Sequence, residues 1–178
     1  MLNPIRSDPC TTLIEVTYSS YGLLLHQKKI IRDLLKVHNC SDVSSVTSPL
    51  DVNVKLTVDS GYLLPSPESY RSLVGKLNFL TYTRPDLCFA VQHLSQFLQA
   101  PRAPHMQAVL HLLRYLKGTS DVGVFFSNSP STSVAAYYES DWAACPDTRR
   151  SVTGFCIFLG GRLIAELELY SLALQVGA

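Results

Sequence analysis

Apolar residues recur at helical spacing in three consecutive segments between residues 67 and 119. Positions three or four apart share one face of a helix, so each segment predicts a helix with one buried stripe. The stripes are formed by Tyr70, Leu73, Val74, Leu77 and Leu80, by Leu87, Val91, Leu94 and Leu98, and by Met106, Val109, Leu110, Leu113 and Leu116. Pro101 and Pro104 separate the second segment from the third, and Gly118 ends the third. Because the turns between them are short, we predict helices that pack antiparallel or as a corner around one core.

Upstream of these segments the pattern changes from strand to helix and then loses its period. Residues 13–18 alternate and are rich in β-formers, and residues 23–26 follow a turn, so together they predict a β-hairpin. Residues 28–37 carry apolar side chains on one side, which predicts a further helix. Residues 39–67 contain several prolines and no period. A connector of this length is typical of a strap across a surface or of a flexible link.

Downstream of Thr119 the pattern predicts strands. They cover residues 122–126, 133–139 and 152–159, and Gly160 with Gly161 predicts a turn into a short piece at 162–164. Residues 165–174 carry leucines that suit a short helix better than a strand. The whole chain therefore predicts the α+β class, with strands and helices in separate stretches.

Composition narrows the possible functions. Hydrophobic residues make up 47% of the 178 residues, and 15 basic against 14 acidic side chains give a net charge of +1. This balance lacks a basic field strong enough to indicate nucleic-acid binding by itself. Five scattered cysteines indicate a reducing compartment rather than a disulfide framework. Residues 1–12 have no apolar run and no stretch reaches the ~18–20 apolar residues of a membrane span, so we expect no signal peptide and no membrane contact. We expect an intracellular protein, cytoplasmic or nuclear, that is not secreted.

Several motifs in a fixed order resemble one known family. They are Leu73-Val-Gly-Lys-Leu77, Thr83-Arg-Pro-Asp86, Arg114-Tyr-Leu-Lys-Gly-Thr119 and the run from Ser140 to Gly161. From about Leu13 onward, the chain resembles the Pol polyprotein of copia-type LTR retrotransposons. The resemblance implies the last part of the reverse transcriptase followed by the start of ribonuclease H.

The resemblance also implies an organisation. Residues 1–12 are expected to form an irregular tail, and residues 13–66 a primer-holding hairpin, a helix and a long connector. Residues 67–119 correspond to a thumb-like helical module. Residues 120–178 correspond to a truncated ribonuclease H-like segment, an incomplete mixed sheet with a short helix.

Both reactions of the family use magnesium or manganese held by carboxylates. The chain contains no Asp-Asp pair, so the polymerase centre is expected to precede Leu13. In the ribonuclease H motif Glu139 stands where the family has an aspartate, and Asp141 is an alternative ligand on the same face of a strand. Glu168 matches the next acid, while the family's strand before it is expected to be deleted and its remaining acids to lie beyond Ala178. We therefore predict no cofactor for this segment and no catalysis, and we weigh ordinary surface acids as the alternative for all three.

Two groups of polar side chains are candidates for phosphate contacts. One lies on the helix after the hairpin and the other on the third helix of the module. They are Lys28, Lys29, Arg32 and Lys36, and then Gln107, His111, Arg114 and Lys117. The pattern alone favours a solvated helix face for either group, and the family resemblance brings the two explanations to near parity.

Three functions remain open from the sequence. The first is a catalytically silent part of a polyprotein whose parental role is RNA-directed DNA synthesis and processing of RNA–DNA hybrid. The second is a weak binding module for RNA–DNA hybrid or duplex nucleic acid, whose binding would fall steeply with salt. The third is a protein-interaction module that self-associates through the strand edge left by the missing strand.

Overall fold

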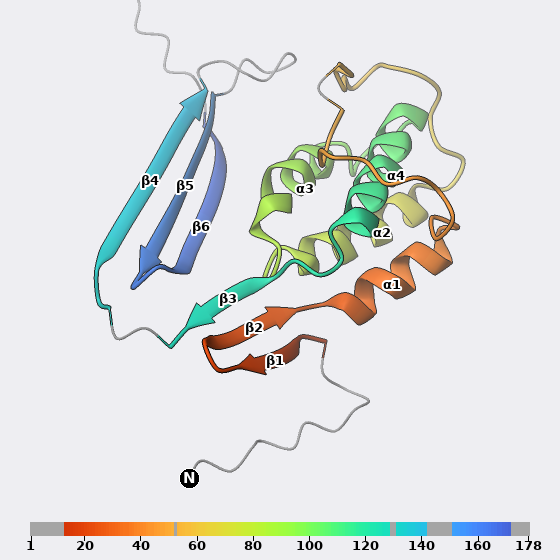
Figure 1. Cartoon of the computed structure of the whole chain (residues 1–178). Coiled ribbons are helices and arrows are strands. Elements are labelled where there is room, and N and C mark those ends of the chain that lie inside the picture. Colours follow the sequence, from red (N-terminus) through yellow and green to blue (C-terminus); the bar gives the residue numbers. More distant parts are fainter. Residues whose placement is uncertain (1–12, 52, 129–130, 142–150, 172–178) are drawn as a thin grey trace, which may run out of the picture.

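The computed structural model describes residues 13–51, 53–128, 131–141 and 151–171, which form an α+β structure with two three-stranded antiparallel sheets and four α-helices (Figure 1). The elements are β1 (Glu15–Ser19), β2 (Gly22–His26), α1 (Lys28–Val37), α2 (Pro67–Leu80), the 3₁₀-helix η1 (Pro85–Leu87), α3 (Cys88–Ser95), α4 (Ala103–Gly118), β3 (Val124–Ser127), β4 (Val134–Asp141), β5 (Ser151–Leu159) and β6 (Arg162–Ser171).

The three helices predicted between residues 67 and 119 share one core, and α1 packs against the same core. All five residues of the α2 stripe are buried, from Tyr70 to Leu80. The α4 stripe is only partly correct, because Leu112 is fully buried while Leu110 is half-buried. Helix α4 contacts α1, α2 and α3, so its buried arc is wider than the single stripe that the spacing predicts.

The predicted hairpin gains a third strand from much later in the chain. Strand β2 pairs with β1 on one side and with β3 on the other. The sequence grouped residues 122–126 with the C-terminal strands, and that assignment is wrong. Gly22 permits the pairing, because its φ is +153° and an added Cβ would lie 2.0 Å from the Phe126 carbonyl oxygen.

The C-terminal sheet has the order β4-β5-β6 and is antiparallel, not mixed. The helix predicted over residues 165–174 is wrong, because β6 extends from Arg162 to Ser171; residues 172–174 lie outside the described residues. In β6, Leu167 and Leu169 alternate with Glu166 and Glu168, which is strand periodicity. The expectation of a missing strand beside β5 is also wrong, since β6 pairs along the length of β5 with one irregularity at residues 157–158.

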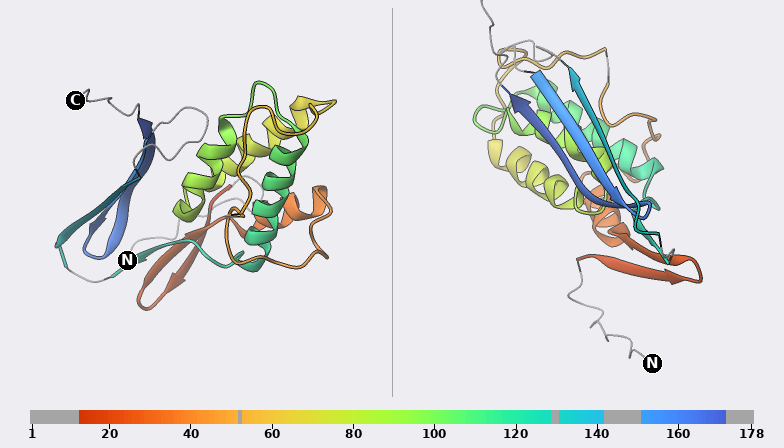
Figure 2. Two further views of the ribbon diagram at one scale, coloured as in Figure 1. Left: turned by 90° about the horizontal axis from the view of Figure 1, so that it is seen from above. Right: turned by 90° about the vertical axis from the view of Figure 1, so that its left-hand side faces the viewer.

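The two ends of this sheet differ in their surroundings. Strand β6 lies on the side of α3 and β3, whereas β4 forms the outer edge, far from the helices (Figures 1 and 2). The connector, residues 39–66, contains no helix and no strand in its described residues. It crosses over α4 and is tied to it by an isolated bridge between Leu63 and Arg102.

Candidate functional site

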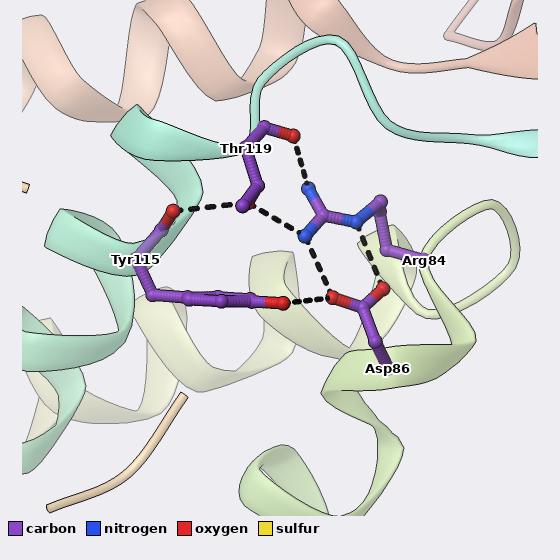
Figure 3. Close-up of polar contacts among 4 residues, drawn as sticks. All are labelled: Arg84, Asp86, Tyr115 and Thr119. Carbon is purple, nitrogen blue, oxygen red and sulfur yellow. Dashed lines mark hydrogen bonds and ion pairs between the residues drawn. The ribbon is translucent and has the colours of Figure 1, made fainter. Parts of the chain in front are cut away.

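Arg84 lies in the turn between α2 and η1, and its side chain is completely buried. A buried cation is stable only when its donors are paired. Its Nε and Nη2 donate to the two carboxylate oxygens of Asp86 at 2.9 and 2.7 Å. Nη1 and Nη2 also donate to the carbonyl and hydroxyl oxygens of Thr119 at 2.9 and 2.8 Å. The guanidinium is therefore held on two sides (Figure 3).

The last turn of α4 supplies further contacts to Arg84 and Asp86. The Tyr115 hydroxyl donates to the second Asp86 oxygen at 2.9 Å, and the Thr119 hydroxyl donates to the Tyr115 carbonyl at 2.9 Å. The guanidinium carbon of Arg84 lies 5.6 Å from the centroid of the Tyr115 ring, within cation–π range. We call Arg84, Asp86, Tyr115 and Thr119 the arginine cluster. It joins two of the family-like motifs, 83–86 and 114–119, which are remote in sequence.

The preceding residue extends the connection to α1. Thr83 is fully buried, and its hydroxyl donates to Gln27 Oε1 at 2.7 Å, at the start of that helix. The arginine cluster and Thr83 thus fix α1, α2, η1 and α4 relative to one another.

Electrostatics keep the arginine cluster in one protonation state. Burial raises the pKa of Asp86, but hydrogen bonds and charge from Arg84 and the Tyr115 hydroxyl outweigh it, so the pKa lies below its ordinary value. Burial, and then the neighbouring Asp86, raise the pKa of Tyr115. At neutral pH the carboxylate is therefore charged and the phenol neutral, an arrangement that holds the fold together rather than one that transfers protons.

The predicted polar face of α4 lies under the connector. His111 Nε2 donates to the Ser48 carbonyl at 3.1 Å, and Arg114 donates to the Ser44 carbonyl and hydroxyl at 2.9 and 3.2 Å. Lys117 Nζ donates to the Val43 carbonyl at 2.7 Å. Gln107, the fourth member of the predicted group, is exposed. Three of the four candidates therefore already bind the chain's own backbone.

Two further residues, Arg102 just before α4 and His105 in its first turn, hold the other end of the connector, and the sequence did not single them out. Arg102 donates to the Gly61 carbonyl at 2.6 Å and lies 3.8 Å from the Asp59 carboxylate. His105 is fully buried, accepts the Arg102 backbone N–H at Nδ1 and pairs through Nε2 with the Thr57 carbonyl, at 3.0 Å each. Its ring stacks on the Phe97 ring, with 3.9 Å between the two ring centroids. The position of His105 in the first helical turn, directly after Pro104, was the feature of the sequence that could have indicated a capping role for this side chain.

The predicted basic group on α1 divides into two parts. Lys28 forms an ion pair with Asp121 at 2.5 Å. Lys29, Arg32 and Lys36 are exposed and follow one another at spacings of three and four, so they share a stripe. Among the described residues these three side chains have no ion-pair partner within 4.0 Å. Glu15 accepts the Lys29 backbone N–H at 2.9 Å, which caps the helix end without using the ammonium group.

The acidic candidates lie on the C-terminal sheet. Glu139 on β4 and Glu168 on β6 both stand opposite Gly154 on the central strand, and Asp141 is two residues further along β4. Residues in register share a face of a sheet, so the three positions lie on one face. They occupy strands two apart, roughly 10 Å from strand to strand. A metal site here would need carboxylates that converge between the two outer strands of this sheet.

Neither a metal-ligand cluster nor a membrane-spanning helix is found in the described parts of the chain. Where side chains are described, no three His, Cys, Asp or Glu residues come together as metal ligands. No described helix is both long and apolar enough to cross a bilayer.

Known proteins similar to the chain include transposon polyproteins and plant mitochondrial proteins. The retrovirus-related Pol polyprotein from transposon RE2 of Arabidopsis thaliana is 40% identical over 147 residues, 83% of this chain and 10% of the polyprotein. The corresponding polyprotein from transposon TNT 1-94 of Nicotiana tabacum is 33% identical over 85% of this chain and 12% of its own length. The uncharacterized mitochondrial protein AtMg00240 of Arabidopsis thaliana is 58% identical over 78 residues, 44% of this chain and 70% of that protein. No family model and no solved structure matches the chain.

The α+β fold and these similarities define a segment of a transposon polyprotein. The chain belongs to the family of retrovirus-related Pol polyproteins from copia-type transposons, as its motifs predicted. It spans about a tenth of the length of the Pol polyproteins that it matches.

Proposed function

We propose that the chain is a non-catalytic segment of a copia-type Pol polyprotein, covering the end of the reverse transcriptase and the start of ribonuclease H. In the polyprotein it would serve RNA-directed DNA synthesis and hybrid processing by holding nucleic acid, not by cutting it. The order of its motifs and the compact helical module support this assignment. The parental reactions would use magnesium or manganese held elsewhere in the polyprotein.

The stripe of Lys29, Arg32 and Lys36 on α1 carries the binding part of the proposal. These cations are exposed and have no ion-pair partner in the described ranges, so they are available to phosphates. By contrast, Arg114 and Lys117 on α4 would have to give up hydrogen bonds to the connector before they could bind a ligand. We therefore place the phosphate contacts on α1 rather than on α4. The exposed Asp33 on the same helix reduces the charge of the stripe, which favours weak binding.

Salt dependence tests this assignment. For three phosphate contacts the logarithm of the association constant for labelled RNA–DNA hybrid should fall with the logarithm of salt with a slope of about −2.7. Replacing Arg32 and Lys36 with glutamine should reduce the slope to about −1, since each lost contact removes about one unit. Fluorescence anisotropy between about 25 and 200 mM KCl measures the slope.

The matched control is Arg114→Gln with Lys117→Gln, which removes the same charge from α4. We expect this variant to keep a slope close to that of the wild type. The opposite ranking of the two variants would place the contacts on α4, and undetectable binding at low salt would refute the binding function.

Catalytic silence is a separate expectation. Glu139 is one methylene longer than the family's aspartate, which displaces its oxygens from tight metal geometry, so we expect no hydrolysis of the RNA strand of a hybrid. End-labelled hybrid incubated with Mg²⁺ or Mn²⁺ gives the measurement. Cleavage that is lost in Glu168→Ala, but kept in the control Glu68→Ala on the exposed face of α2, would show that the segment is an active nuclease.

A further inference from the structure

The first part of the connector, residues 41–49, forms a flap over the C-terminal half of α4. The flap is anchored at both ends, by Cys40, which is buried, and by Leu50, which packs against the core. Between these anchors no residue is buried. In the described ranges of the chain, no backbone–backbone hydrogen bond ties the flap to another segment. The contacts that hold the flap on the helix therefore come from side chains.

Three donors of α4 supply those contacts. His111, Arg114 and Lys117 follow one another at spacings of three residues, so they share one face of the helix. Their acceptors on the flap are, in the same order, Ser48, Ser44 and Val43. Helix α4, which is described throughout, contains no aspartate or glutamate, so no acid on the helix itself neutralises the two cations. The flap therefore covers a purely basic helix face.

The second part of the connector is held differently. Leu56 is buried in the core, and two backbone hydrogen bonds tie residues 62–64 to residues 101–103. In the flap, by contrast, the hydrogen bonds of Arg114 and Lys117 are exposed to solvent. Local opening occurs where buried contacts are few and hydrogen bonds are exposed. We therefore expect the flap to open about its two anchors while residues 56–64 stay in place.

Gly118 allows the flap to approach the helix closely. A Cβ added to this glycine would lie 3.0 Å from the Cβ and 3.4 Å from the hydroxyl oxygen of Ser45. Gly118 is the last residue of α4, and its φ is not in the left-handed region. The glycine is therefore required for space rather than for its backbone freedom. A larger side chain here should lift the flap without removing any charge from α4.

We propose that the flap masks a second phosphate site, formed by Arg114 and Lys117, and that RNA–DNA hybrid binds there when the flap is open. A phosphate is the ligand that fits, because its charged oxygens form stronger hydrogen bonds with cations than neutral carbonyl oxygens do. Arg114 is also able to bind two oxygens at once, as it does with the carbonyl and hydroxyl of Ser44. The inference rests on the proposed function for the kind of ligand, but its site is independent of the α1 stripe.

Hybrid binding by the full chain carrying Gly118→Val tests the proposal. Opening the flap adds two phosphate contacts, so the slope of log association constant against log salt should steepen from about −2.7 in the wild type to about −4.5. The matched control combines Gly118→Val with Arg114→Gln and Lys117→Gln. It opens the flap but removes both cations, and its slope should return to about −2.7. Fluorescence anisotropy between about 25 and 200 mM KCl measures all three slopes.

Limited proteolysis reports the opening of the flap itself. Proteinase K cleaves an exposed loop when it opens away from the fold, and mass spectrometry locates cuts within residues 41–49. Cleavage there should be faster than in the wild type in Gly118→Val. It should also be faster in Arg114→Gln with Lys117→Gln, because these substitutions remove donors that hold the flap. If neither variant is cleaved faster, the flap is not held in this way and the proposal is wrong.

The binding data decide the rest. An unchanged slope in Gly118→Val despite faster cleavage would overturn the proposal, as would a steep slope that persists in the triple variant. If circular dichroism shows that Gly118→Val does not fold, Gly118→Ala takes its place, since alanine favours a helix more than glycine does. Failure of the proposed α1 contacts looks different. The wild type would then not bind hybrid, whereas Gly118→Val would bind it with a slope of about −1.8.

Discussion

Replacing Arg84 with leucine should lower the free energy of unfolding by about 3–5 kcal/mol, the usual cost of removing one partner from a buried ion pair. Leucine removes the two N–H groups that Arg84 donates to the Asp86 carboxylate, which is only 33% exposed. It also removes both donors from the Thr119 oxygens, which then face a non-polar side chain. Urea unfolding followed by circular dichroism measures the loss.

Arg71→Leu is the matched control for this substitution. The Arg71 guanidinium also donates to two carbonyl oxygens, those of Leu98 and Gln99, but it is exposed. Exposed contacts of this kind contribute about 1 kcal/mol or less, so equal losses in the two variants would show that burial of Arg84 is not what matters.

The same prediction has a pH signature. The pKa of Asp86 is lower in the folded chain than its ordinary value, so its ionised form stabilises the fold. That stabilisation is fully present above about pH 4 and is lost as the pH falls towards the folded pKa. In Arg84→Leu the loss between about pH 4 and 2 should be smaller than in the wild type. An unchanged acid profile would mean that the arginine does not control the carboxylate.

Truncating Leu112 to alanine should cost about 2–5 kcal/mol, because its side chain is fully buried and the other three helices leave little room for collapse. The control is Leu110→Ala on the same helix, where the side chain is half-buried and the cost should be about 1 kcal/mol. The sequence stripe includes Leu110 and omits Leu112. A larger loss at Leu110 would therefore favour the simple stripe over the packing in the structure. Thermal and urea unfolding of both variants give the comparison.

The helical module could be predicted because its period is local. Tyr70, Leu77 and Leu80 are spaced so that only a helix brings them to one face, and all three are buried. The same logic placed Lys28, Lys29, Arg32 and Lys36 on or beside the polar side of α1, and the structure separates Lys28 from the other three by its ion pair with Asp121. In β6, however, the leucines predict a short helix, whereas the alternation of residues 166–169 fits the observed strand.

Other features depend on contacts between distant residues. The burial of Arg84 requires Thr119, and no pattern around residue 84 indicates that partner. Similarly, spacing showed that Arg114 and Lys117 share a face of α4. The length of the connector is typical of a strap across a surface, but its aperiodic sequence does not indicate which face it covers. The edge pairing of β3 with β2 was missed for the same reason.

The way in which α4 holds the connector has a consequence for sequence drift. The accepting groups at Val43, Ser48 and Thr57 are main-chain carbonyls, which every amino acid supplies, whereas the donors are particular side chains of α4. Substitutions at those three connector positions therefore leave the acceptors in place. These hydrogen bonds therefore restrict the amino acids allowed on the helix but not those at Val43, Ser48 and Thr57, whereas connector residues such as Leu56 stay constrained by their burial in the core.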